Sequence, residues 1–271
     1  MLTGCAAQLK AAAAGSLIRD VAVATAKHDD LDLAISGAPT YLLLLEGLLE
    51  GNPKNSTLLS ATSEAYLSYG ALVESESTER AIRLYGRGQQ YAERSLAGNR
   101  KVTALLQAPY SEFVQLDQYL KKNDLEKVFW LASSWGAWIS LNTQSMQALA
   151  ELPKVIYLME WVLRTDATFY YGSPHIFLGV YHAALPPMLG GSPEKSKDHF
   201  AKAKELSQGR MLMVDVQMAR YYARQIFDRK LYTDLLGQVL ESDPQAGPLT
   251  LQNVAAQRLA RQLLEETDDY F

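Results

Sequence analysis

The helical spacing of the apolar residues is the feature of this sequence that most constrains its fold. After about residue 20, apolar side chains recur at intervals of three and four residues, and no segment combines strict alternation with β-branched enrichment between turns. Of the 271 residues, 48% are hydrophobic, which suffices for a large core. We therefore predict an all-α fold of stacked antiparallel helix pairs, an α-α superhelix. Residues 1–20 form an N-terminal tether in this prediction, and residues 21–271 form a single helical domain.

Proline and glycine mark where the predicted helices begin and end. Ser173-Pro174, Ser192-Pro193 and Ala38-Pro39 place proline at the first position of a helix, where its missing N–H costs nothing. Asp124 is a predicted N-cap. Predicted helix ends lie at Gly51-Asn52-Pro53, Gly98-Asn99, Gly190-Gly191, Gly209 and Asp243-Pro244.

One predicted helix pair carries a degraded tetratricopeptide (TPR) signature. Leu178-Gly179 followed by His182 matches the first helix of such a repeat, and the second helix is matched by Ser196, Phe200 and Ala203. Gly179 lets the partner helix approach, and Phe200 fills the space between the helices. The connection between them is about five residues longer than a repeat of roughly 34 residues allows. We predict cryptic TPR-like repeats, about four pairs, which share a continuous core.

The charge balance argues against a nucleic-acid partner. Lys and Arg total 26 against 30 for Asp and Glu, the net charge is -4, and neither sign forms a block. No run of about 18 apolar residues occurs, so no membrane-spanning helix is predicted.

Cys5 is the only cysteine, which excludes an intrachain disulfide and a cysteine-based zinc site. Leu2-Thr3-Gly4-Cys5 resembles the bacterial lipobox, in which the cysteine is acylated after cleavage of a signal peptide. The charged and apolar regions of that peptide are expected upstream of Met1. Several acyl chains would anchor the protein firmly. The motif predicts lipidation of Cys5 and membrane contact through this anchor alone.

The sequence contains no recognisable catalytic constellation. Asp29-Asp30-Leu31-Asp32 resembles the aspartate-rich motif of helical terpenoid synthases, but Leu33 replaces the distal aspartate, so we interpret the run as a helix start. His175 and His182 can share a helix, yet their separation of about 10 Å is too great to bind one metal directly. We predict no catalytic residues, no cofactor and no metal. An all-α enzyme with carboxylates from distant helices is the least favoured alternative.

Two aromatic segments are candidates for contact with a ligand. Trp135 and Trp138 fall on one helical face among small residues, which suits either a tightly packed core helix or a ligand or pore wall. The helix entry from Tyr170 to His175 allows the same two interpretations. The candidate ligand or pore residues are Trp130, Trp135, Trp138, Tyr170, Tyr171 and His175.

Several segments together carry a family resemblance. They are Pro39 to Leu49, Asn52 to Asn55, the block from His175 to Leu206, and the stretch from Asp228 to Phe271. These segments resemble the TatT family, the TPR-containing T component of tripartite ATP-independent periplasmic (TRAP) transporters, and Cys5 also fits. The resemblance implies a lipoprotein on the periplasmic side of a bacterial membrane that is not an enzyme. It further implies a homo-oligomer, a trimer around a central pore, that docks a TRAP solute-binding protein and helps ligand uptake or handover.

The irregular connection between the TPR-like helices is the predicted docking site, because loops that depart from a repeat commonly carry function. Its residues are Pro186, Pro187, Met188, Leu189, Gly190 and Gly191. We expect this loop and the Tyr170-to-His175 turn to contribute to partner docking or to the pore mouth. The alternative function is a general TPR scaffold lipoprotein for protein–protein interaction in the cell envelope.

Overall fold

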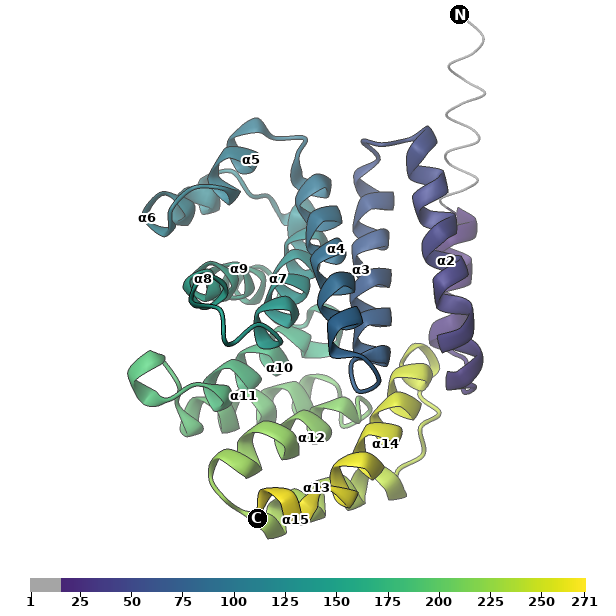
Figure 1. Cartoon of the computed structure of the whole chain (residues 1–271), viewed down its shortest axis with the longest axis vertical. Coiled ribbons are helices and arrows are strands. Elements are labelled where there is room, and N and C mark those ends of the chain that lie inside the picture. Colours follow the sequence, from purple (N-terminus) through teal and green to yellow (C-terminus); the bar gives the residue numbers. More distant parts are fainter. Residues whose placement is uncertain (1–15) are drawn as a thin grey trace, which may run out of the picture. The chain divides into compact units, whose positions relative to one another are not determined.

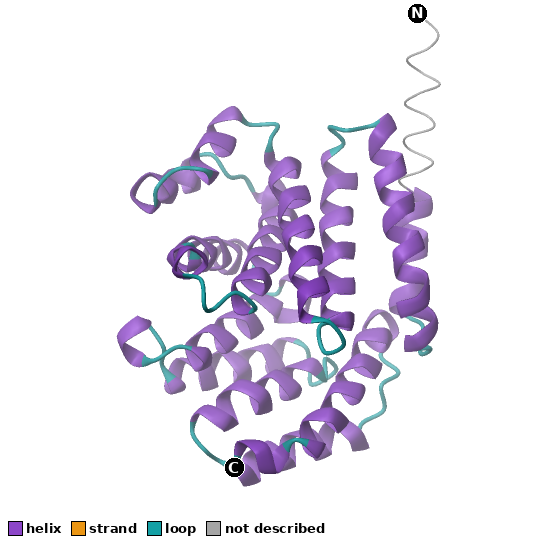
Figure 2. Ribbon diagram, in the orientation of Figure 1, coloured by secondary structure: helices purple, strands orange, loops and turns teal. Residues whose placement is uncertain are grey.

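The computed structural model describes residues 16–271, and all regular secondary structure in that range is helical (Figures 1 and 2). The prediction of an all-α fold is confirmed. Cys5 and its lipobox lie outside the described residues. The chain forms two compact units, the first made of Asp32–Thr165 with the described residues up to Ala22, the second of Val23–Leu31 with Asp166–Phe271. The prediction that residues 21–271 form one domain stays a prediction.

The first unit is a stack of helices around an apolar core. Its helices are α2 (Leu31–Gly51), α3 (Ser56–Val73), α4 (Thr78–Leu96), α5 (Arg100–Leu106), α6 (Tyr110–Phe113), α7 (Leu125–Ser140), α8 (Met146–Ala150) and α9 (Leu152–Thr165), with 3-10 turns at Val114–Gln118 and Lys122–Asp124. α3 packs on α4, α4 on α7, and α7 on α9. α2, α3 and α4 share an apolar core that includes Leu45, Leu59 and Tyr66.

The second unit pairs helices in the same manner. Its helices are α10 (Phe169–Ala184), α11 (Pro193–Leu206), α12 (Met213–Gln217), a π-helical segment (Met218–Ala223), α13 (Arg229–Glu241), α14 (Thr250–Glu265) and α15 (Thr267–Tyr270), with 3-10 turns at Pro187–Leu189 and Gly247–Leu249. α10 packs on α11, and α13 packs on α14. Asn253 on α14 is buried and accepts from the Leu212 N–H, so it satisfies the backbone at the start of α12.

The helix start predicted at Pro39 is wrong. α2 begins at Leu31 and contains Pro39. Proline removes one helical hydrogen bond, but the apolar face that Ile35 begins before it continues with Leu42 and Leu45 after it, and all three pack in the core. Burial of that continuous face offsets the lost bond.

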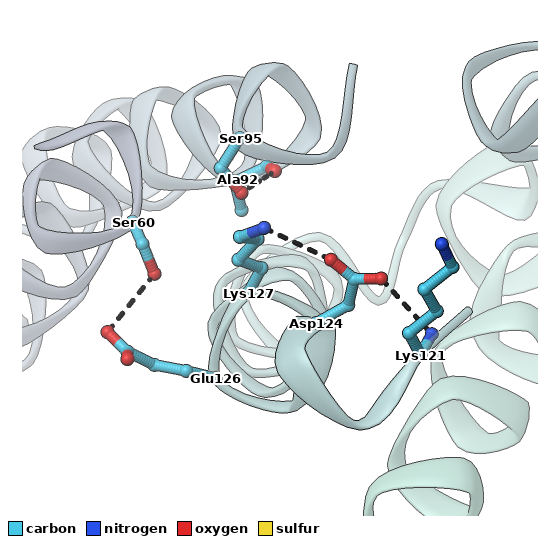
Figure 3. A network of polar contacts seen from close by, with 7 residues as sticks. All are labelled: Ser60, Ala92, Ser95, Lys121, Asp124, Glu126 and Lys127. Carbon is cyan, nitrogen blue, oxygen red and sulfur yellow. Dashed lines mark hydrogen bonds and ion pairs between the residues drawn. The ribbon is translucent and has the colours of Figure 1, made fainter. Parts of the chain in front are cut away.

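Ser192 and Asp124 show how the other predicted helix starts are built. Ser192 caps α11 by accepting from the Lys195 N–H, with Pro193 at the first helical position, as predicted. Asp124 directly precedes α7, but its carboxylate accepts from the Lys121 N–H at 3.1 Å and from the Lys127 ammonium at 3.0 Å, not from an α7 amide (Figure 3). Asp124 therefore closes the preceding 3-10 turn.

Among the described helices, α2 is long and apolar enough to meet a length and composition test for crossing a membrane. Core helices and signal sequences meet the same test, so this is weak support for a span. One face of α2 packs in the core of the first unit. There Glu46 Oε1 accepts from the Tyr66 hydroxyl at 2.7 Å and from the Tyr91 hydroxyl at 2.8 Å, which ties α2 to α3 and α4.

Candidate functional site

The α10–α11 pair is the scaffold of the candidate site. A Cβ atom added at Gly179 would lie 3.1 Å from the Phe200 ring, and the Ser196 hydroxyl donates to the Gly179 carbonyl at 2.8 Å. Phe200 and Ala203 are fully buried. Gly179 therefore permits the close approach of the two helices that the sequence predicted, while the wider TPR-like repeat stays a prediction.

The entry to α10 is a left-handed turn. Tyr170, Tyr171 and Gly172 have φ values of 45°, 59° and 82°, and the right-handed helix resumes after them. Left-handed backbone costs a non-glycine residue roughly 1–2 kcal/mol, so two consecutive tyrosines here store strain. The two rings contact each other edge to face, with centroids 6.1 Å apart. Tyr171 packs against the core of the second unit, and Tyr170 is exposed.

The Pro186-to-Gly191 loop is closed by its own backbone. The Pro186 carbonyl accepts from the N–H groups of Leu189 at 2.9 Å and Gly191 at 3.1 Å. Gly190 has a φ of +95°, and a Cβ atom at Gly191 would lie 1.7 Å from the Leu185 carbonyl oxygen, so both positions require glycine.

This closed loop presents two apolar side chains to solvent. Met188 is 96% exposed and Leu189 is 63% exposed. Side chains of this size are normally buried in part, so the loop offers an apolar surface whose shape is already fixed.

Three histidines connect the loop to the helix entry. His199 on α11 lies between His175 and His182 on α10, with ring centroids 5.1 Å and 5.6 Å away. His175 Nδ1 and His199 Nδ1 are 2.9 Å apart, so one donates and the other accepts. His182 Nδ1 lies 3.0 Å from the Gly190 carbonyl oxygen, which can only accept, so this nitrogen carries the proton. The cluster therefore holds Gly190 against α10.

The surroundings of His175 and His199 favour their neutral rings. Burial and the adjacent His175 and His182 lower the pKa of His199 to about 4. Burial and Lys202 lower the pKa of His175. Neutral His175 and His199 keep their shared hydrogen bond, because two protonated rings could not donate to each other. In residues 16–271 no three His, Cys, Asp or Glu side chains are arranged to hold a metal ion.

The predicted tryptophans lie in the first unit. Trp130 and Trp135 are buried, and Trp135 contacts the Phe113 ring edge to face at 6.4 Å. Trp138 is half-buried beside Gly86, 3.7 Å from the position of an added Cβ. Two hollows of about 250 and 340 Å³ in this unit are not lined by these indoles. A ligand or pore role for the three tryptophans stays a prediction.

The sequence interpretation missed His199. It assigned His175 and His182 to one helix, which is correct, but the third ring comes from α11, 24 residues after His175. The usable signal was the matched helix pair, since aligning Gly179 with Phe200 also brings His199 towards the same face of α10.

The described residues thus form an all-helical protein in which packed helix pairs hold an ordered, exposed loop. The chain belongs to the TRAP transporter T-component family, TatT, because the model of that family matches residues 27–271. T components are accessory, non-catalytic parts of a transporter in the cell envelope. A comparison with curated proteins finds no match.

Proposed function

We propose that this chain is a periplasm-facing lipoprotein that docks the solute-binding protein of its TRAP transporter and helps ligand uptake or handover. The docking site is the loop from Pro186 to Gly191 together with the Tyr170-to-His175 turn. The observation that carries the proposal is the exposure of Met188 and Leu189 on a loop whose shape is already fixed. A fixed loop loses little conformational entropy when a partner binds.

The strained helix entry supports the same assignment. Consecutive left-handed tyrosines are kept only where the surrounding structure holds them, and such strain concentrates at functional sites. The exposed Tyr170 ring supplies an amphipathic surface of the kind enriched at protein interfaces. His175 joins this turn to the histidine cluster, and His182 joins the cluster to the loop. Contacts among the three histidines thus link the two parts of the proposed site along α10 and α11.

The remaining elements of the proposal come from the sequence. The lipobox supplies lipidation at Cys5, the aromatic helix face supplies a solute path that includes Trp130, Trp135 and Trp138, and the family resemblance supplies a trimer around a central pore. Loss of the chain from the membrane fraction in a Cys5→Ala variant tests the anchor.

The docking site is tested with a Met188→Asp/Leu189→Asp double variant and the solute-binding protein of the same transporter. Full burial of one such side chain contributes about 1.5–3 kcal/mol, so losing two fully buried contacts should cost about 3–6 kcal/mol, or roughly 150- to 25,000-fold in Kd. Biolayer interferometry on the Cys5→Ala background measures this directly.

Met146→Asp is the matched control. Met146 is 80% exposed on α8, far in sequence from the loop, and its substitution should change Kd less than threefold. Equal affinities for the double variant and the control would refute the docking site. Failure of the unsubstituted chain to bind the solute-binding protein, with capture of other envelope proteins instead, would favour a general scaffold lipoprotein.

A further inference from the structure

A hollow of about 340 Å³ lies between α2 and α4 in the first unit, beside the turn that joins α2 to α3. Figure 1 shows these two helices on either side of α3. The hollow is lined by two arginines of α4, Arg87 and Arg94, and by two glutamates of α2, Glu46 and Glu50. Its lining therefore carries charges of both signs and no net charge.

Glu46 and Arg87 neutralise each other. Glu46 Oε1 accepts from the Arg87 guanidinium at 2.9 Å and from the hydroxyls of Tyr66 and Tyr91 at 2.7 and 2.8 Å. Burial opposes ionisation of Glu46, but these hydrogen bonds and the charge of Arg87 outweigh it and lower the pKa of this carboxyl. The pair thus forms one fixed wall of the hollow and leaves no net charge there.

Arg94 is held in place but has no carboxylate partner. Its guanidinium lies over the Tyr91 ring, 5.1 Å from the centroid, and donates to the Pro53 carbonyl at 3.3 Å. Tyr91 is itself stacked on Tyr66, with ring centroids 5.5 Å apart, and both rings belong to the core. A guanidinium has five N–H donors in a planar fork that matches a carboxylate. The contact with Pro53 leaves most of these donors for a ligand, and the stacked rings limit the side-chain entropy that binding would cost.

Glu50 supplies the opposite charge at the same hollow. It is exposed on α2 and forms no hydrogen bond or ion pair with another residue in the described range 16–271. A ligand with only a negative group would gain Arg94 but lie beside the Glu50 carboxylate, and a ligand with only a positive group would lie beside Arg94. A ligand that carries both charges satisfies both side chains.

We propose that this hollow binds a small zwitterion of the α-amino acid class, with its carboxylate on Arg94 and its ammonium group on Glu50. The volume is at the lower end of the range for ligand pockets, roughly 300–1,000 Å³, which suits a molecule of this size. Leu49 and Pro53 complete the lining and offer apolar surface to an aliphatic side chain. A phosphoethanolamine headgroup carries the same two charges but lacks that aliphatic part.

The charge requirement is tested by isothermal titration of the full chain, as the Cys5→Ala variant, with three ligands that share one carbon skeleton. L-Leucine carries both charges, 4-methylpentanoate lacks the ammonium group, and 3-methylbutylamine lacks the carboxylate. Loss of a hydrogen bond to a charged group corresponds to about tenfold or more in Kd, so leucine should bind about tenfold more tightly than either analogue. Equal affinities for leucine and one analogue, or no binding of leucine, would overturn the proposal. Tighter binding of glycerophosphoethanolamine than of leucine would overturn the assignment to amino acids.

Two substitutions assign the contacts. Arg94→Gln and Glu50→Gln should each weaken leucine binding about tenfold. Arg94→Gln should leave the affinity for 3-methylbutylamine unreduced, and Glu50→Gln should do the same for 4-methylpentanoate. Both side chains are exposed, so circular dichroism should show an unchanged fold.

Arg83→Gln is the matched control for these substitutions. Arg83 is exposed on α4 and pairs with Glu79 outside the hollow, so the Kd for leucine should stay within about threefold. An Arg94→Gln variant that binds leucine as tightly as the Arg83→Gln control would overturn the proposed site. No solute-binding protein takes part in these titrations, so their outcome is independent of the docking proposal.

Discussion

Replacing Gly70 with alanine should destabilise the first unit, because the close packing of α3 on α4 leaves no room for a side chain there. A Cβ atom at Gly70 would lie 2.5 Å from Tyr85 Cε1 and 2.8 Å from Cδ1, well inside the ordinary contact distance of roughly 3.5–4.0 Å. Tyr85 is buried, and its hydroxyl donates to Glu74 Oε2 at 2.6 Å. The ring therefore cannot turn away without disturbing that hydrogen bond.

The expected size of the effect combines three terms. Overpacking a core costs about 1–3 kcal/mol. Loss of a hydrogen bond to a charged group adds about 1.5–3 kcal/mol if Tyr85 is displaced. Alanine returns about 1 kcal/mol through its higher helix propensity. With Tyr85 displaced, the net loss for Gly70→Ala is therefore about 1.5–5 kcal/mol, which is a fall in Tm of roughly 5–15 °C for a chain of this size.

Tryptophan fluorescence during thermal unfolding measures this loss of stability, because it monitors the unit that contains Gly70. The four tryptophans, Trp130, Trp135, Trp138 and Trp161, all belong to the first unit. Gly47→Ala, inside α2 of the same unit, is the matched control, because a Cβ atom there meets nothing within 4 Å. It should stabilise the protein by about 0.5–1 kcal/mol. The two substitutions thus have opposite expected signs, and a Gly70→Ala variant as stable as the unsubstituted protein would refute the packing argument.

Two further predictions concern pH and cooperativity. Burial and the neighbouring Glu126 raise the pKa of Glu64 from 4.5 to about 7. A carboxyl whose pKa is higher in the folded state contributes fully below the unfolded value and loses that contribution as the pH rises through 7. Glu64→Gln should therefore gain about 1–3 kcal/mol relative to the unsubstituted protein between pH 5 and pH 8, measured by urea unfolding, and a difference that does not change with pH would contradict this. If residues 21–271 are one cooperative domain, tryptophan fluorescence and far-UV circular dichroism will give coincident unfolding transitions, whereas separated midpoints would mean two domains.

The fold was predictable because its signals are local. Apolar spacing identifies a helix within ten or so residues, and caps such as Ser192 with Pro193 act within one turn. The helix start predicted at Pro39 was wrong because the rule considers local backbone only. The burial that keeps α2 helical through Pro39 comes from packing against α3 and α4. Local rules for proline in helices do not include the free energy of tertiary packing, which here exceeds the cost of the lost hydrogen bond.

The candidate site was predictable only in part. An overlong connection between matched helices identified the Pro186-to-Gly191 loop from sequence, and the Tyr170-to-Gly172 stretch was recognised as irregular. Its left-handed backbone was not foreseen, because tyrosine rarely adopts that conformation and no local rule selects it. His199 escaped notice because its contacts cross between helices. Both missed features depend on packing between helices, and the spacing of residues in the sequence does not show which helices pack together.

The backbone of the proposed docking loop, Pro186 to Gly191, limits how a partner could recognise it. The N–H groups of Leu189, Gly190, Gly191 and Ser192 all donate within the chain, to Pro186, Pro187, Pro186 and His182 respectively. From Leu189 to Ser192 no backbone donor is left for a strand that would pair with the chain, which disfavours recognition of this stretch by β-strand addition. The apolar side chains of Met188 and Leu189 are what the loop offers. A partner that fits them needs a concave apolar pocket, and the double aspartate variant removes the feature that such a pocket would bind.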